Sequence, residues 1–198
     1  MNKPIKIILL LFSLLWITQG LKEKADPIAN HFKQSQDTLC LNAYLFLQEN
    51  AFRNEKLEMI EKKDFLIQDI ELAVNSCRNA LAEKKLSFPI FCNYVLPQRI
   101  FYEKPGNWRK FYRNYFAYLK GRPALEICDS INNKFKKRFQ FGENAQPYQT
   151  IGWEALQSLS TGGCYLMAKS LIHPLRAMGI PTTIDFIHTW GNEKGAHC

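Results

Sequence analysis

The sequence has no C-x-x-C pair, although it contains six cysteines among its 198 residues. Zinc knuckles and dense disulfide frameworks need closely and regularly spaced cysteines, so neither a metal site nor a small cross-linked domain is expected. Internal repeats and low-complexity tracts are also absent, which excludes repeat arrays and disordered tethers. With 46% apolar residues, the chain is long enough for one domain with a hydrophobic core.

The N-terminal segment lacks the length of a membrane-spanning helix. In MNKPIKIILLLFSLLWITQG, two lysines precede an apolar run from Ile7 to Ile17, and the short segment Thr18-Gln19-Gly20 follows the run. The run is well short of the roughly 20 residues that a span requires. The pattern is typical of a signal peptide over residues 1–20. We therefore expect an exported protein, periplasmic or extracellular, that meets the membrane only through this segment.

The charge balance is positive, at +8 for the whole chain. The densest cluster is KFKKRF, at residues 134–139. An anionic envelope polymer could bind such a cluster, although a solvated helix face is its commoner meaning. Nucleic acid is not expected as a partner of an exported protein.

Residues 21–150 are predicted to form a mostly helical N-terminal region. Apolar residues at helical spacing predict helices, which the three prolines at 89, 97 and 105 interrupt. The predicted helices cover residues 37–50, 64–84, a short segment up to 95, 107–119 and 123–138. The expected core face of the fourth helix is Trp108, Phe111, Tyr115 and Tyr118, and that of the fifth is Leu125, Cys128, Ile131 and Phe135. Buried free thiols are expected at Cys40, Cys77 and Cys128.

Residues 151–198 have a different pattern. Two glycines precede Cys164, and the apolar run from Cys164 continues to Met178, where Gly179 can cap a helix. The segment TTIDFIHTW alternates as a strand does, GNEKG is typical of a turn, and AHC begins a second strand. The fold class predicted for the whole chain is therefore α+β.

The lengths of these elements bring a histidine towards Cys164. The helix advances about 21 Å at 1.5 Å per residue. The strand over residues 182–189 returns about 23 Å at 3.3 Å per residue, so a short hairpin places His197 near the cysteine. His188 at the end of the first strand remains a competitor, whereas His173 lies on the opposite helix face and is excluded as the cysteine's partner.

This pairing would give a cysteine unusual reactivity. A helix N-terminus and an imidazolium both favour the thiolate, and together they can lower a cysteine pKa by several units from about 8.5. The same imidazole can protonate a leaving amine, and backbone N–H groups at the helix start can hold an oxyanion. The pattern favours Cys164 as a nucleophile, with His197 preferred over His188 as its partner on hairpin placement.

The motifs Gly163-Cys164, LRAMGIP at residues 175–181 and Gly195-Ala196-His197 resemble the transglutaminase-like core, a branch of the papain-like cysteine enzymes. The upstream segment FCNYVLPQRIFYEKPGNWR resembles the region that precedes this core in exported bacterial members. The resemblance implies acyl transfer or hydrolysis on peptide or protein amides through a Cys164–His197 pair. It implies no metal and no organic cofactor.

The resemblance also has a gap. The family's third catalytic residue, usually an Asp on the strand after the histidine, would fall beyond Cys198, and Asp185 is expected to be structural instead. We therefore interpret the sequence as a C-terminally truncated fragment, with residues 151–198 as the first part of the core, and expect it to be inactive alone. The alternative function is a non-catalytic module of the same fold that binds an envelope polysaccharide or protein.

Overall fold

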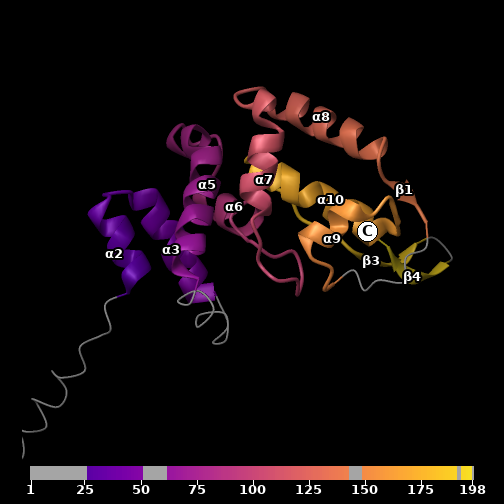
Figure 1. Ribbon diagram of the computed structural model, residues 1–198, viewed down its shortest axis with the longest axis horizontal. Helices are drawn as coiled ribbons and strands as arrows, with labels where there is room; N and C mark the ends of the chain where they lie inside the picture. The colour runs from indigo at the N-terminus through magenta and orange to yellow at the C-terminus, as the bar shows by residue number, and fades with distance from the viewer. Residues whose placement is uncertain (1–25, 51–61, 143–148, 191–192, 198) are drawn as a thin grey trace, which may run out of the picture.

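The computed structural model describes residues 26–50, 62–142, 149–190 and 193–197, with side chains through Ile187. These residues form a mostly helical structure with four short strands at one end (Figure 1). The helices are α2 (Pro27–Gln34), α3 (Thr38–Asn50), α5 (Lys63–Ala82), α6 (Phe88–Tyr94), α7 (Trp108–Tyr115), α8 (Ala124–Lys136), α9 (Trp153–Ser158) and α10 (Cys164–Ala177), and a 3-10 turn, η1, covers Ala117–Leu119. Within the described residues, no helix is both long and apolar enough to cross a membrane.

Aspartate side chains cap the first two described helices, α2 and α3. The Asp26 carboxylate accepts hydrogen bonds from the backbone N–H groups of Ile28 and Ala29 at 3.0 and 3.1 Å, which fixes the start of α2. The same side chain accepts from the Tyr44 hydroxyl at 2.7 Å and thereby links α2 to α3. Asp37 caps α3, because its carboxylate accepts a hydrogen bond from the N–H of Cys40 at 3.1 Å.

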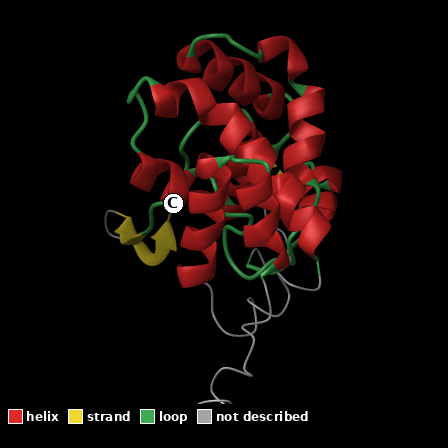
Figure 2. Cartoon of the chain, turned by 90° about the vertical axis from the view of Figure 1, so that its left-hand side faces the viewer, coloured by secondary structure: helices red, strands yellow, loops and turns green. Residues whose placement is uncertain are grey.

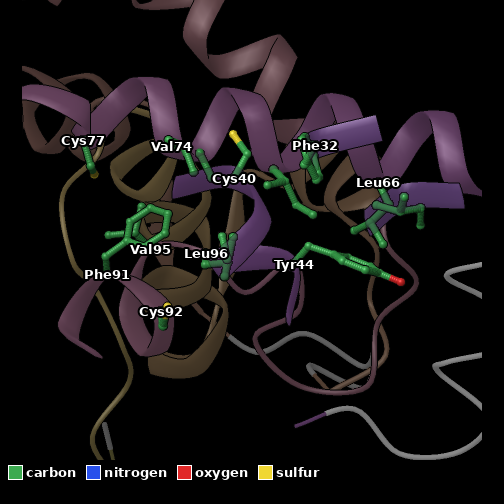
Figure 3. Close-up of a cluster of buried hydrophobic side chains, with 14 of the residues drawn as sticks. Phe32, Cys40, Tyr44, Leu66, Val74, Cys77, Phe91, Cys92, Val95 and Leu96 are labelled. Carbon is green, nitrogen blue, oxygen red and sulfur yellow. The ribbon is translucent and has the colours of Figure 1, made fainter. Parts of the chain in front are cut away.

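The first hydrophobic cluster joins α2, α3, α5 and α6 (Figure 3). Phe32, Tyr44, Val74 and Phe91 point into it from four different helices, and Leu96 from the segment after α6. Cys40, Cys77 and Cys92 are buried there as free thiols. The predicted buried thiols at 40 and 77 are therefore confirmed, whereas Cys128 on α8 is only half-buried.

A second cluster joins α7 and α8 to α10, with Trp108, Ile131 and Ala177 among its members. Its residues come from both sides of the domain boundary predicted at residue 150, so the packing is continuous across that position. A third, smaller cluster seats the start of α10 through Phe139, Leu156 and Leu166. Figure 2 shows the helices gathered together, with the β3–β4 hairpin at their edge.

The predicted core face of α7 is wrong in part. Trp108 is buried, but Phe111, Tyr115 and Tyr118 are 38%, 47% and 65% exposed. The buried stripe continues instead through Tyr112, Phe116 and Leu119. Two adjacent stripes of this helix are apolar, and the one that faces α8 and α10 becomes core. In the same way Leu125 of α8, expected in the core, is 73% exposed because Ile127 occupies the inward position.

The strands form two separate pairs. Strand β1 (Gln140–Phe141) pairs in parallel with β2 (Thr161–Gly162), and β3 (Ile187–Trp190) pairs with β4 (Glu193–His197) in antiparallel register. A mixed helix and strand composition therefore agrees with the predicted α+β class. The described strands do not join into one sheet, and the β1–β2 pair is parallel.

The strand predicted at residues 182–189 begins later, at Ile187. Residues 181–186 are irregular, and other groups take the backbone hydrogen bonds of Thr182. The Arg176 guanidinium donates to the carbonyl of Thr182 at 3.0 and 2.9 Å, and the N–H of Thr182 donates to the carbonyl of Tyr94 at 3.0 Å. This stretch is consequently held against α6 and α10 rather than in a sheet.

Candidate functional site

Cys164 is the first residue of α10, as the sequence predicts, and its side chain is partly exposed. Gly163 precedes it in an extended conformation and has no side chain to cap the helix. A helix N-terminus carries a partial positive charge and favours negative charge near it. The position suits a thiolate and an oxyanion.

The approach to Cys164 is fixed by the β1–β2 pair. The N–H of Gln140 donates to Ser160 at 2.8 Å, and the N–H of Gly142 donates to Gly162 at 3.1 Å. Gly162 also lies so close to its neighbours that an added Cβ would meet Leu166 at 2.9 Å. Only glycine fits there without displacing α10, so the first of the two glycines serves packing rather than flexibility.

An aromatic contact joins the start of α10 to the beginning of β3. Tyr165, the residue after Cys164, has its ring 5.1 Å from that of Phe186. Phe186 also packs on Phe101 at 5.8 Å. Ile187 follows Phe186 and is the register partner of His197 in β4. One side-chain contact and one strand pairing therefore connect the backbones at Cys164 and His197.

The structure does not bear on the imidazoles of the two competing histidines. The backbones of His188 and His197 lie in β3 and β4, and their side chains fall outside the described side chains. His173 is buried and stacks on Trp108 with a ring separation of 4.6 Å. Asp185 is exposed.

Buried thiols elsewhere are poor nucleophiles. Burial raises the pKa of Cys40 to about 12 and that of Cys92 to about 12. Burial also raises the pKa of Cys77 and of the half-buried Cys128. Among the cysteines whose side chains are described, Cys164 is thus the one whose place in the fold favours reaction.

Two buried arginines, which the sequence interpretation did not single out, hold the segment between α6 and α7. Arg176 of α10 donates to the carbonyls of Pro97 and Arg99 at 3.1 and 3.2 Å. Arg109 of α7 donates to the carbonyls of Val95 and Leu96 and to the Asp69 carboxylate at 2.9 Å. The irregular segment after α6 has no partners in a helix or sheet, so guanidinium groups satisfy its carbonyls.

A second buried ion pair lies along the middle of α10. Lys169 Nζ is 3.0 Å from Glu103 Oε2 and donates to the carbonyl of Ile151 at 3.0 Å. Glu103 also accepts from the N–H groups of Ile100 and Phe101, at 2.6 and 3.0 Å. The sequence signal that could have indicated this pair is Lys169, a charged residue within a largely apolar helix. Both networks position α10, and neither reaches the Cys164 thiol.

In the part of the chain that the structure describes, no group of three or more His, Cys, Asp or Glu side chains is placed to hold a metal ion. Comparisons with protein-family models, curated proteins and solved structures found no match to this chain. Its function is therefore argued from its own geometry.

Proposed function

We propose that this chain carries the nucleophilic half of an exported, transglutaminase-like thiol site, with Cys164 as nucleophile and His197 as its proton-transfer partner. The observation that carries the proposal is the link from Tyr165 through Phe186 to the Ile187–His197 register. It holds the β3–β4 hairpin beside the start of α10, where a thiolate is electrostatically favoured. The resemblance of the surrounding motifs to the transglutaminase-like core points the same way.

The chemistry follows from these positions. The Cys164 thiolate attacks the carbonyl carbon of a peptide or protein amide, and N–H groups at the start of α10 stabilise the oxyanion. As the C–N bond breaks, the imidazolium gives its proton to the leaving amine and a thioester remains. Water or an amine, deprotonated by the same imidazole, then attacks the thioester and releases the acid or the new amide.

The pH dependence of Cys164 alkylation tests this proposal. Iodoacetamide is the probe, and mass spectrometry of the Cys164 peptide reports the rate in a background with Cys128→Ser and Cys198→Ser. A Cys–His pair should react well below pH 7, because an imidazolium favours the thiolate. His197→Gln should move the midpoint towards the ordinary thiol value of about 8.5.

His188→Gln is the matched control, since it removes the competing imidazole from the neighbouring strand. It should leave the midpoint in place. A larger effect of His188→Gln would transfer the role to His188. A rate that rises only near pH 8.5 in the parent protein would refute the thiolate and support the non-catalytic alternative.

A further inference from the structure

The positive charge of the chain is concentrated in one segment. Residues 107–138, from the start of α7 to the end of α8, contain nine Lys and Arg against two Asp and Glu, whereas the remaining residues contain 17 against 16. Seven of the nine cations have exposed side chains, and Arg109 and Arg113 are the two exceptions. The exposed side chains of the α7–α8 unit therefore carry most of the excess positive charge of the chain, seven cations against two carboxylates. A surface of this kind attracts polyanions.

The same unit presents a hollow with aromatic walls. Its volume is about 80 Å³, and its lining residues are Phe111, Tyr112, Tyr115, Lys134, Phe135, Arg138 and Gln157. The rings of Phe111 and Tyr115 lie 5.9 Å apart with planes only 14° from parallel. Both rings are partly exposed. They form a stacked aromatic pair that lines the hollow and is partly open to solvent.

Two cations border this aromatic surface. Lys134 lies in the last turn of α8, and Arg138 lies two residues beyond its end. Lys134 Nζ is 5.7 Å from the centre of the Tyr115 ring. Arg138 is close enough to Tyr112 to oppose the rise in pKa, to about 12, that burial causes in that phenol. None of the residues that line the hollow carries a carboxylate. The hollow thus offers room and charge for one small anionic group beside the stacked aromatic pair.

We infer that the α7–α8 surface binds an acidic polysaccharide, with a sugar ring stacked on Phe111 and Tyr115 and its carboxylate directed to Lys134 and Arg138. The C–H face of a sugar ring is apolar and complements the electron-rich face of an aromatic ring. A guanidinium and an ammonium together match a carboxylate. Further carboxylates along the polymer would meet the exposed Lys136 and Lys137.

Single-stranded nucleic acid also combines flat rings with anions, and such a surface could stack bases. The polysaccharide is favoured because residues 1–20 have the pattern of an export signal, which places the chain among envelope glycans. This inference concerns α7 and α8, and it stands independently of the Cys164 chemistry.

Binding of polygalacturonate by the whole chain, measured by isothermal titration calorimetry, tests the inference. Lys134→Gln with Arg138→Gln should weaken binding by about tenfold, since two charge-assisted contacts are lost. Tyr115→Leu should weaken it about threefold, because it keeps apolar area but removes the flat ring. The charge-matched control is Lys33→Gln with Lys84→Gln, on exposed positions outside the α7–α8 unit, and it should change affinity less than about twofold. Thermal unfolding verifies that each variant is folded.

Three ligands of different chemistry complete the test. Neutral dextran should not bind, and polyglutamate, which has no rings, should bind more weakly and be indifferent to Tyr115→Leu. Tighter binding of poly(dT) than of polygalacturonate would replace the glycan with nucleic acid and overturn the inference. Equal binding of polyglutamate and polygalacturonate, with no effect of Tyr115→Leu, would reduce the surface to nonspecific charge. A failed alkylation test leaves this result unaffected, since the two experiments probe different elements.

Discussion

Replacing Arg109 by methionine should destabilise the protein more than any ordinary surface change. Arg109 is fully buried, and its guanidinium donates to Asp69 Oδ1 at 2.9 Å, to the Leu96 carbonyl at 2.9 Å and to the Val95 carbonyl at 3.1 and 3.2 Å. Methionine fills much of the volume but leaves the carboxylate and both carbonyls without these donors. The change therefore isolates the polar role of the side chain.

The magnitude follows from the groups left behind. Breaking one partner out of a buried ion pair costs about 3–5 kcal/mol. Each buried carbonyl that loses its donor adds about 1–3 kcal/mol. We expect Arg109→Met to lower the free energy of unfolding by at least about 4 kcal/mol, a large part of the about 5–15 kcal/mol typical of a domain. Burial already raises the pKa of Asp69, and loss of the guanidinium would raise it further.

Urea denaturation followed by circular dichroism gives the free energies of unfolding. Arg113→Met is the matched control, because Arg113 lies one turn further along α7 and donates a single bond, to the Leu72 carbonyl at 3.2 Å. It should cost about 1 kcal/mol. The double variant Asp69→Leu with Arg109→Met should recover part of the loss, since no buried charge remains unpaired. If Arg109→Met lowered the free energy of unfolding no more than Arg113→Met does, the hydrogen bonds of the buried Arg109 guanidinium would not be a major source of stability.

Two further changes probe backbone strain and a buried histidine. Gly179 has φ +82°, and a Cβ added there would lie 2.6 Å from the Ser76 carbonyl oxygen, whereas Gly121 has φ +79° and open space around it. In thermal melts, Gly179→Ala should therefore lower the free energy of unfolding by several kcal/mol and Gly121→Ala by only about 1 kcal/mol. Equal losses would exclude a steric role for the glycine at 179. Burial and the surrounding cations depress the pKa of His173 well below 6.5, so the unfolded chain takes up a proton that the folded one excludes. Stability should therefore fall by up to about 1.4 kcal/mol per pH unit as the pH drops below about 6.5. His173→Phe should flatten this dependence and His31→Phe, at an exposed site, should not; an unchanged pH profile in His173→Phe would contradict it.

The helices could be predicted from the sequence because caps and apolar periodicity are local patterns. Asp37 precedes an apolar run and caps α3, and the apolar residues of α5 recur every three or four positions. The start of α10 at Cys164 could be predicted from the two glycines before it. A cap or a periodic stripe depends on residues within one or two turns, so the sequence displays it directly.

The sequence alone could not show which of the two apolar faces of α7 is buried. The stripes Trp108–Phe111–Tyr115 and Trp108–Tyr112–Phe116 are both apolar, and only the placement of α8 and α10 decides that the second is core. The first part of the predicted strand, residues 182–186, is not a strand for a related reason. Thr182 is bonded by Arg176 and Tyr94, whose proximity is a property of the folded chain.

In the candidate site, too, local features follow from the sequence and their arrangement follows from tertiary packing. The sequence by itself determined that a cysteine opens a helix and that a histidine follows in a hairpin, because glycine placement and alternation are local. The tertiary structure decided how these pieces relate: it packs Tyr165 on Phe186 and pairs Ile187 with His197. It also sets the aromatic rings of α7 beside the cations of α8. Such contacts join residues distant in sequence, and they form only when the helices pack against one another.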